Sequence, residues 1–382
     1  MNYTIYLTDG CNLNCKYCYE KNMHKNNEIP FEYIKGIVDD EINSKSQFSI
    51  LTFYGGEPLL KKKLIYETDK YINAQKHSTK FLYNMTTNGT LIDDEFVSFF
   101  DDNKFISLSL SIDGTEKSHN ENRKTLGTKD TFEVVKENAK KLISKSDIVV
   151  AVPVVSKSSA CRIYENLIEL LDIGFKRINF QFDFTANWED EDLEIIKREF
   201  SKVAEKYIEA MREEKEFHLL QIDEKIRSYI DDSMDCNDDC SVGMRGANLG
   251  TDGNIYPCMQ FMYDERYKIG DYKTGIDKKR QIKVHNELKR EMDECKECDL
   301  KKRCNHTCSC LNKAYTGSPT TTSPFTCEIE RMMISVADEI GEKLYKEKNP
   351  IFIQKFYNMN YNSIERDILK KGGNPYGTKE SK

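Results

Sequence analysis

Three cysteines near the start of the chain constrain it more than any other feature. The segment Cys11-Asn-Leu-Asn-Cys15-Lys-Tyr-Cys18 places three thiols within eight residues, separated by three residues and then by two. Three thiolates at this spacing can hold one iron–sulfur cluster and leave one of its irons open to a reactive ligand. A zinc knuckle is the alternative, but it needs a fourth ligand at short spacing, and His24 is the nearby candidate.

Charge and composition narrow the class of protein. The 382 residues carry a net charge of −7, so no basic surface points to nucleic acid as a partner. The chain has neither a signal-peptide pattern nor an apolar run of membrane-spanning length, and we expect a cytoplasmic protein. A reducing compartment disfavours disulfides, so the 13 cysteines indicate metal binding, and oxygen-labile clusters would imply an anaerobic setting.

Strand and helix patterns alternate through the first half of the chain. Candidate strands lie at 3–8, 47–54, 81–87, 105–112, 147–155 and 177–184. Helical patterns separate them, which predicts parallel βαβ units arranged as an open sheet or a barrel. Two helices are expected within 188–232, and another is expected to follow Cys327 to about Lys346.

The two faces of these strands differ in polarity. From Ile106 to Ile112 every second residue is apolar, and serines stand between them, followed by Asp113. Parallel strands covered by helices on both faces normally read as continuous apolar runs, so this polar face predicts a wet interior that holds a ligand. The segment 147–155 is apolar on both faces, and its Pro153 predicts a bulge or an edge.

Short motifs follow three of the strands. They are Gly55-Gly56-Glu57-Pro58, Thr87-Asn88-Gly89 and Ser111-Ile112-Asp113-Gly114. Glycine pairs and Asn-Gly or Asp-Gly steps are turn-forming sequences, and that role alone would explain them. Because the carboxyl ends of parallel strands share one edge, we also expect these motifs to lie near each other.

A second cysteine array begins where the composition changes, around Asp231–Cys236. This change predicts a boundary, with domains at 1–234 and 235–347 and a tail at 348–382 whose end is disordered. The cysteines in the second array are Cys236, Cys240, Cys258, Cys295, Cys298, Cys304, Cys308 and Cys327. Their spacing suits iron–sulfur clusters, and a pair of structural zinc sites is the alternative.

With these motifs in this order, residues 3 to about 345 resemble radical S-adenosylmethionine (SAM) enzymes that carry a SPASM extension. The resemblance implies an α/β fold, a partial (β/α)6 barrel followed by a cysteine-rich SPASM domain. It implies three [4Fe–4S] clusters, one SAM-binding and two auxiliary. In this family the open iron of the first cluster chelates SAM, whose reductive cleavage yields a 5'-deoxyadenosyl radical that abstracts a hydrogen atom from the substrate.

The resemblance also assigns roles to single residues. Cys11, Cys15 and Cys18 match the ligands of the SAM-binding cluster. The positions that match SAM contacts are Tyr17, Gly55, Gly56, Glu57, Asn88, Ser111, Asp113 and Arg123. A surface position for the arginine and a packing role for the tyrosine are the alternatives.

The same resemblance divides the second array between two auxiliary clusters. One set is Cys236, Cys240, Cys258 and Cys308, and the other is Cys295, Cys298, Cys304 and Cys327. Relatives space the first two ligands more widely, so Cys236 departs from the pattern; without it the first auxiliary cluster would have an open iron for a substrate thiolate. Cys161 is expected to be an ordinary packing residue, and Cys310 a spare thiol near a cluster.

Two substrate classes dominate the resembling family, and both are peptides. Anaerobic sulfatase maturases oxidise a Cys or Ser to formylglycine, and peptide maturases join a cysteine sulfur to a carbon in ribosomal peptides. Sulfatase maturases carry an acid directly after the position of Cys258, whereas this chain has Met259-Gln260-Phe261. The prediction is therefore thioether formation, with formylglycine formation as the alternative and a non-catalytic iron–sulfur or zinc scaffold as a second alternative.

No residue is identified as a catalytic base, and Asp183 and Glu57 are the candidates. The predicted partners are a cysteine-containing peptide or protein and a reducing electron donor such as flavodoxin or ferredoxin. Many peptide maturases begin with a leader-binding domain, and this chain starts at its first strand, so a separate leader-binding protein is a further expected partner.

Overall fold

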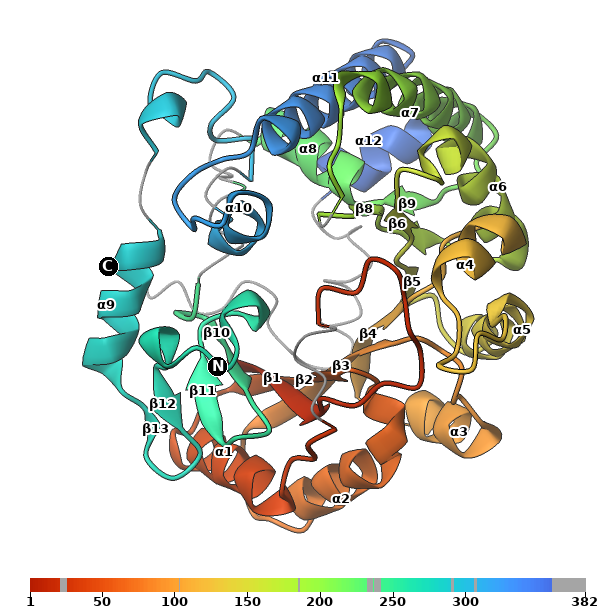
Figure 1. Cartoon of the computed structure of the whole chain (residues 1–382). Coiled ribbons are helices and arrows are strands. Elements are labelled where there is room, and N and C mark those ends of the chain that lie inside the picture. Colours follow the sequence, from red (N-terminus) through yellow and green to blue (C-terminus); the bar gives the residue numbers. More distant parts are fainter. Residues whose placement is uncertain are drawn as a thin grey trace.

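The fold, seen in a computed structural model, is built on one strongly curved sheet with helices along its outer side (Figure 1). The structure describes residues 1–20, 26–102, 104–184, 186–231, 236, 242–289, 292–305 and 308–358. The sheet has eleven strands in the order β13-β12-β11-β10-β1-β2-β3-β4-β5-β7-β9. This arrangement confirms the predicted fold class, a partial barrel of alternating strands and helices.

The barrel strands pair in parallel from β1 to β9. They are β1 (Asn2–Thr8), β2 (Phe48–Gly55), β3 (Lys80–Thr87), β4 (Phe105–Leu110), β5 (Val149–Ala151), β7 (Arg177–Ile178) and β9 (His218–Leu219). The intervening helices are α1 (Phe31–Asn43), α2 (Lys62–Asn73), α3 (Asp94–Asp102), α4 (Glu116–Asn122), α5 (Phe132–Ile143) and α6 (Ile163–Ile173). Leu108 and Leu110 of β4 are buried in the core with apolar residues of these helices, as the alternation predicts.

The opposite face of the strands is polar across neighbouring strands. Thr52 is in register with Asn84, and Asn84 with Ser107, so three polar side chains cross the sheet at one level. The Oδ1 atom of Asn84 is buried without a hydrogen-bond partner among the described residues. A buried polar atom of this kind normally finds a ligand or a water, which fits the expectation of a wet interior.

The sequence predicts one strand at 147–155, but the structure has two strands there. After β5 the chain breaks at Pro153, and β6 (Val154–Val155) pairs with β8 (Gln181–Phe182) in a separate two-stranded sheet. Pro153 has no N–H to donate, but its carbonyl accepts a hydrogen bond from Gln181 N–H at 2.9 Å. The proline therefore ends the ladder of the main sheet and starts a new pairing.

The C-terminal half continues the same sheet beyond the boundary expected near residue 234. β10 (Gly246–Leu249) pairs in parallel with the free side of β1. The antiparallel strands β11 (Asn254–Tyr256), β12 (Gly270–Asp271) and β13 (Gly275–Ile276) follow, and α9 (Lys278–Leu288) comes next. At the end of β1, Asp9 accepts hydrogen bonds from Thr251 Oγ1 at 2.9 Å and from the Tyr263 hydroxyl, which fastens the first cysteine loop to this half.

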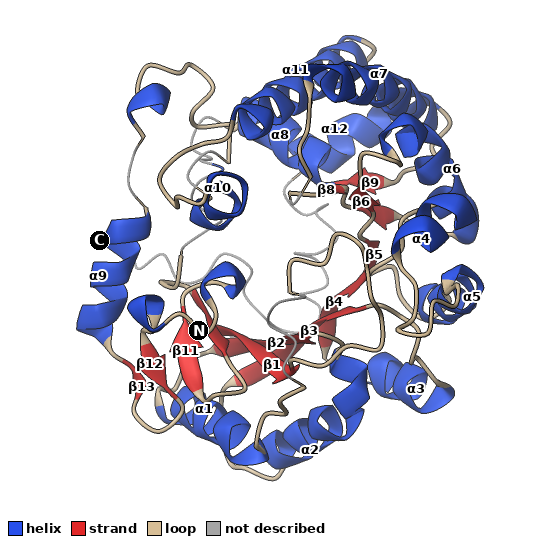
Figure 2. Cartoon of the chain, in the orientation of Figure 1, coloured by secondary structure: helices blue, strands red, loops and turns tan. Residues whose placement is uncertain are grey.

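The helices form an outer layer, and four of them pack together at one end of the barrel (Figure 2). These are α7 (Asp190–Arg212), α8 (Leu220–Ile230), α11 (Pro324–Lys346) and α12 (Pro350–Tyr357), while α10 (Ser309–Thr316) lies nearer the centre. α11 starts before Cys327 because Ser323 caps it, accepting from Thr326 N–H at 3.0 Å. Along the described ranges, no helix has both the length and the apolar composition that crossing a bilayer requires.

The contact between the end of β2 and the cysteine loop can be tested with Gly56→Ala. A Cβ at this position would lie 2.4 Å from the carbonyl oxygen of Gly10, so the two backbones must separate. We expect a loss of about 1–3 kcal/mol in the free energy of unfolding, measured by urea denaturation. Gly127→Ala is the control, because its Cβ would meet nothing closer than 3.9 Å. An equal loss in both variants would contradict this account.

Candidate active site

The first cysteine motif lies in the loop that follows β1. The thiols of Cys11, Cys15 and Cys18 are all partly exposed, and the last two are close enough to influence the first electrostatically. Burial raises the pKa of Cys11 to about 12, although Leu13 N–H donates to its sulfur at 3.4 Å. A thiolate here therefore needs a positive partner, which an iron–sulfur centre would provide.

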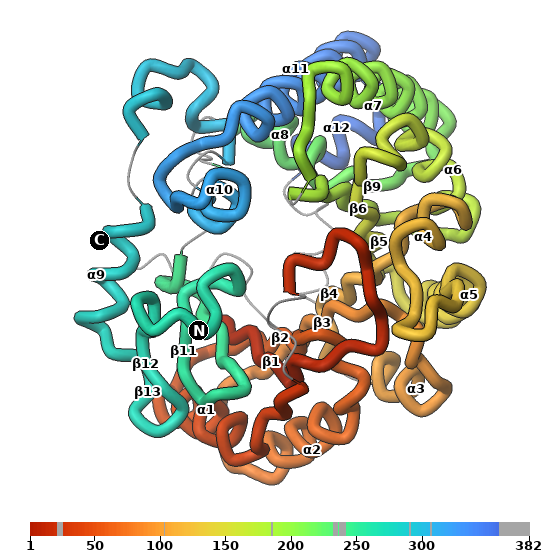
Figure 3. Tube along the Cα trace, viewed as in Figure 1, coloured from red at the N-terminus to blue at the C-terminus, as the bar shows by residue number. Residues whose placement is uncertain are grey.

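This loop is held by the chain that follows α4. The N–H groups of Asn14 and Lys16 donate to the carbonyls of Lys124 at 2.8 Å and Asn122 at 3.0 Å. In Figure 3 the loop, drawn in red, runs beside the orange segment after α4. The cysteines are thus positioned by a segment more than a hundred residues further along the chain.

Gly55 and Gly56 end β2 directly against the cysteine loop. Gly55 has a φ of +132°, and a Cβ on it would lie 2.3 Å from the carbonyl oxygen of Thr8. Glu57 N–H donates to the Gly10 carbonyl at 3.0 Å. Contact between the two backbones therefore requires both glycines, independently of any ligand.

The Glu57 carboxylate is completely buried and points into the protein. Oε1 accepts from Leu59 N–H at 3.0 Å and from Thr87 Oγ1 at 2.7 Å, and Oε2 accepts from Asn88 N–H at 2.7 Å. Burial raises its pKa to about 7, and these three donors limit the rise. The carboxylate therefore joins β2, β3 and the 3-10 turn η1 (Pro58–Lys61), and both oxygens are engaged within the protein.

Asn88 connects the third strand to the cysteine loop. Its Nδ2 donates to Asn12 Oδ1 at 2.8 Å and reaches the Cys11 sulfur at 3.8 Å. Its Oδ1 accepts from Thr90 N–H at 3.0 Å. The structure therefore places this predicted site residue against the first cysteine.

Tyr17, Asp113 and Arg123, which the resemblance connects with SAM, form one buried cluster. Asp113 Oδ1 accepts from Arg123 Nε at 3.0 Å, and Oδ2 accepts from the Tyr17 hydroxyl. The guanidinium lies 5.1 Å from the centre of the Tyr17 ring. Burial alone would lower the Arg123 pKa, but the Asp113 carboxylate raises it, so the guanidinium stays charged. Within the described residues only its Nε donates a hydrogen bond, which leaves the terminal nitrogens for a ligand.

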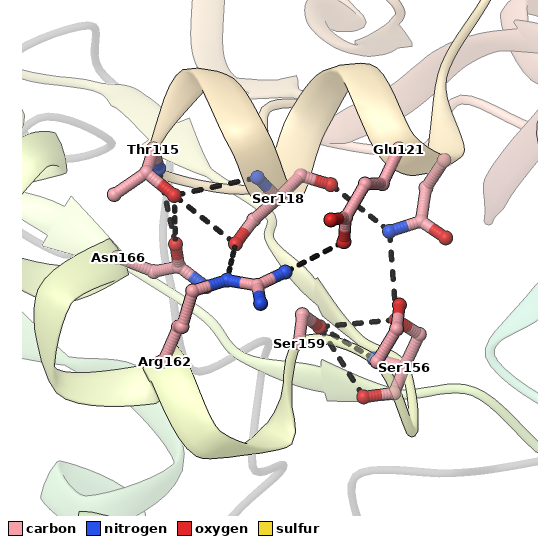
Figure 4. A network of polar contacts seen from close by, with 9 residues as sticks. Thr115, Ser118, Glu121, Ser156, Ser159, Arg162 and Asn166 are labelled. Carbon is pink, nitrogen blue, oxygen red and sulfur yellow. Dashed lines mark hydrogen bonds and ion pairs between the residues drawn. The ribbon is translucent and has the colours of Figure 1, made fainter.

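A polar network fixes the short helix between Asp113 and Arg123 (Figure 4). Thr115 caps α4, and its Oγ1 and N–H both donate to Asn166 Oδ1 of α6, at 2.9 and 3.0 Å. Arg162 donates to Ser118 Oγ at 3.0 Å and to Glu121 Oε2 at 2.6 Å. Because both ends of α4 are tied to the start of α6, the buried ion pair cannot easily shift.

His119, on the inner side of α4, is a neutral structural residue. Burial and the nearby Arg123 lower its pKa to about 3. Its Nε2 lies 3.0 Å from Thr131 Oγ1, and this hydroxyl donates to the Arg123 carbonyl at 2.6 Å. The histidine therefore helps to set the backbone of Arg123.

Two further predicted site residues, Ser111 and Asp183, directly follow β4 and β8. Ser111 is partly exposed and donates its N–H to the Thr87 carbonyl at 2.9 Å. Asp183 is also partly exposed, follows β8, and is close enough to Tyr315 of α10 to influence its pKa. Asp183 thus lies towards the second cysteine array, where a substrate-facing acid would be needed.

Sequence reasoning did not single out a cluster of tyrosines that joins the two cysteine arrays. The hydroxyls of Tyr19 and Tyr54 are 2.7 Å apart, and Tyr19 also donates to the Met259 sulfur at 3.1 Å. Beside them Glu20 is buried and accepts from Tyr6 at 3.0 Å, and burial raises its pKa to about 7. The signal was present, because Tyr19 and Glu20 directly follow the first motif.

One predicted auxiliary set surrounds a cavity. Cys295, Cys298, Cys304 and Cys327 all line a space of about 240 Å³ near the start of α11. Nowhere in the described ranges do three Cys, His, Asp or Glu side chains converge as the ligands of a single metal ion do. Four thiols around one cavity could serve as ligands of an iron–sulfur cluster or of zinc.

The other predicted set is arranged differently from expectation. Cys258, which precedes the 3-10 turn η4 (Met259–Phe261), lies near Cys308. The thiol of Cys310, which was expected to be a spare thiol, forms hydrogen bonds with both of them. Cys236 lies beside Lys225. Cys240 lies outside the described residues, as do His24 and the end of the tail.

A larger cavity of about 580 Å³ opens between the last strands and the C-terminal helices. Its lining includes Asn179 and Gln181, from the polar face predicted for the strand at 177–184. Leu311 and Tyr315 of α10 and Phe325 of α11 form part of its apolar wall. A cavity of this size with a few polar groups suits a peptide or small-molecule ligand.

Comparison with known families identifies the first half of the chain. Residues 5–167 match the family described as the radical SAM superfamily. The chain carries a radical SAM domain. The non-catalytic scaffold considered above is therefore set aside.

Over most of its length the chain is similar to anaerobic sulfatase-maturating enzymes. It is 28% identical over 335 residues to a cysteine-type anaerobic sulfatase-maturating enzyme of Clostridium perfringens, covering 79% of this chain and 86% of that one. It is 25% identical over 334 residues to a serine-type enzyme of Bacteroides thetaiotaomicron, covering 78% and 80%.

Two solved structures share its fold, including the cysteine-rich SPASM-type region. Native anSMEcpe with bound AdoMet aligns with a TM-score of 0.76 at 21% identity, covering 91% of this chain and 99% of that chain. Streptococcus suis SuiB bound to S-adenosylmethionine aligns with a TM-score of 0.58 at 17% identity, covering 85% and 76%.

The residues present fit the cofactors of a radical SAM enzyme, SAM and one [4Fe–4S] cluster. Three part-exposed thiols share one loop, as a cluster with one open iron requires. A charged, buried guanidinium with uncommitted terminal nitrogens lies beside them, and it suits a carboxylate such as that of SAM.

The internal role of Glu57 predicts the effect of Glu57→Gln. Each carboxylate oxygen accepts from a backbone N–H, so in either orientation the amide NH₂ would face a donor. We expect the free energy of unfolding to fall by about 1–3 kcal/mol in urea denaturation of the iron-free chain. The exposed change Glu95→Gln, which removes only a surface ion pair, is the control. Unchanged stability of Glu57→Gln would show that the carboxylate is not an internal clamp.

Proposed function

We propose that this radical SAM enzyme oxidises a cysteine residue of a peptide or protein. Cys11, Cys15 and Cys18 would hold the SAM-binding cluster. The observation that carries the proposal is the buried Arg123–Asp113 pair beside these three thiols, because it offers a fixed cationic group where the carboxylate of SAM would bind. When bound and reduced by a donor such as flavodoxin or ferredoxin, cluster and SAM together supply a carbon radical that removes a hydrogen atom from the substrate.

The chain's own residues would orient SAM around this loop. Arg123 would bind its carboxylate through the terminal nitrogens, and Tyr17 would present its ring beside the arginine. Ser111 and Asn88, at the ends of β4 and β3, would contact the ribose or the amino-acid part. Gly55, Gly56 and Glu57 would contribute backbone groups, since the Glu57 carboxylate is engaged elsewhere.

Two auxiliary [4Fe–4S] clusters are part of the proposal. Cys295, Cys298, Cys304 and Cys327 would hold one of them, because these four thiols line the same cavity. The remaining cysteines of the second array would hold the other. The two clusters would accept the electron left on the substrate after hydrogen abstraction, as an oxidation requires. We retain residues 235–347 as the region that carries them.

The cavity of about 580 Å³ is the proposed entrance for the peptide. It is open, partly aromatic and lined by polar groups of the inner strand face, and Asp183 lies beside it near Tyr315. Peptide complexes are known for both structural relatives, anSMEcpe with the Cp18Cys peptide and SuiB with its precursor peptide SuiA. A separate leader-binding protein remains part of the proposal.

Formylglycine is the first candidate product. The relatives that match most of this chain are sulfatase-maturating enzymes, and anSMEcpe aligns more closely than SuiB. This support favours the alternative prediction over the preferred one. Thioether formation is the second candidate, because Met259 stands where sulfatase maturases carry an acid and its sulfur is held by Tyr19.

Product analysis separates the two candidates. The anaerobically reconstituted protein with dithionite is expected to convert SAM to 5'-deoxyadenosine. It is then incubated with a sulfatase-type Cys-x-Pro-x-Arg peptide and with a cysteine-rich peptide encoded nearby. An aldehyde on the first peptide, trapped with a hydrazide, supports formylglycine. A loss of two hydrogens in the second, with one thiol no longer alkylated, supports a thioether. If SAM is not cleaved, both candidates fail.

Arg123→Lys tests the proposed SAM site. Lysine keeps the charge but loses the planar pair of terminal nitrogens, so we expect the Kd for SAM to rise about 10- to 100-fold. Equilibrium dialysis of the reconstituted protein measures it, with iron content as a check on the cluster. Arg266→Lys, on the exposed surface, is the matched control. An unchanged Kd for Arg123→Lys would exclude the arginine from the SAM site.

A further inference from the structure

The environment of Cys310 differs from that of a spare thiol. Its sulfur lies 3.0 Å from that of Cys308, and its thiol also hydrogen-bonds to that of Cys258. A disulfide would need a separation of about 2.05 Å, so Cys308 and Cys310 are two thiols in contact and not a disulfide. Three thiols from two distant parts of the sequence therefore meet at one place.

The helix that carries Cys310 is fixed in this position. Cys308 precedes α10 and Cys310 lies in its first turn. Further along the same helix, Lys313 Nζ donates to the Gln260 carbonyl at 3.3 Å and lies 4.7 Å from the centre of the Phe261 ring. Both partners belong to the turn after Cys258, so the packing of α10 holds Cys310 towards Cys258.

Cys236 has different surroundings. It is 1% exposed, and its N–H donates to the Lys302 carbonyl at 2.9 Å. The groups that act most on its thiol are charged and polar side chains of α8 and α11, among them Lys225 and Glu330. These two form an ion pair at 2.9 Å, so Cys236 lies against a buried salt bridge.

We propose that Cys310, together with Cys258 and Cys308, is a ligand of the first auxiliary cluster, and that Cys236 is not. This inference rests on the auxiliary clusters of the proposed function. Because the Cys310 thiolate would replace the Cys236 thiolate, the charge of the site and the number of its sulfur ligands stay the same. It also explains why Cys236 departs from the family spacing, because a cysteine that packs against Lys225 has no spacing to keep.

Iron content and electron paramagnetic resonance (EPR) test the exchange. The full chain with Cys11, Cys15 and Cys18 changed to alanine keeps only auxiliary sites and serves as the background. In it, Cys310→Ala is expected to lose up to about four irons per chain, one [4Fe–4S] cluster, or to change the EPR signal of one reduced cluster. Cys236→Ala and the control Cys161→Ala, whose thiol is exposed, are expected to change neither.

Alkylation of the wild-type protein gives a second measurement that needs no variant. Cys310 is partly exposed, so iodoacetamide at alkaline pH, followed by peptide mass mapping, should modify it in the iron-free chain and more slowly after reconstitution. Cys161 should react quickly in both. Equal reactivity of Cys310 with and without iron would overturn the assignment.

The outcomes distinguish the two levels of the proposal. If Cys236→Ala loses iron while Cys310→Ala keeps both the iron and the EPR signal, the exchange is wrong and the auxiliary clusters stand. If the background protein binds no iron, or binds zinc, the auxiliary clusters are refuted and the role of Cys310 with them.

Discussion

Close contact between two backbones underlies the arrangement of the whole site. The end of β2 lies so near the cysteine loop that neither Gly55 nor Gly56 could carry a side chain without displacing Thr8 or Gly10. The buried Glu57 carboxylate accepts a hydrogen bond from Asn88 N–H at the end of β3, and the Asn88 side chain contacts the Cys11 sulfur. The ends of three strands and the loop of the first cysteines are therefore one rigid unit. Hydrogen bonds between charged and neutral groups within a dry region are strong enough to maintain it.

The fold was largely predictable from the sequence because its main signals are local. Period-two alternation in 105–112 indicates one buried and one polar face, and the structure has both. The break at Pro153 was predicted as a bulge or an edge, yet the new pairing of β6 with β8 was not. That pairing depends on where 177–184 lies in space, and no local pattern records such a distance. The parallel addition of β10 to β1 was missed for the same reason.

The candidate site was predictable where a motif lies on a strand end and less so elsewhere. Tyr17, Asp113 and Arg123 do meet, although the sequence separates the first from the last by more than a hundred residues. The contact of Cys310 with Cys258 follows from the packing of α10, and the tyrosines beside Met259 come from β1, β2 and the first cysteine loop. Such meetings are set by tertiary packing. Sequence spacing relates residues within one segment, but it contains no information on which distant segments come into contact.

The pairing of β10 with β1 has a consequence for how the protein can be divided. β1 carries the first cysteine loop, and without β10 its main-chain N–H and carbonyl groups would form an open edge. Open edges recruit other chains and promote aggregation. The cysteine-rich half therefore also protects the strand on which the radical chemistry is mounted. Shortening this protein to its barrel would expose the edge of β1, so the barrel depends on the other half to cover its first strand.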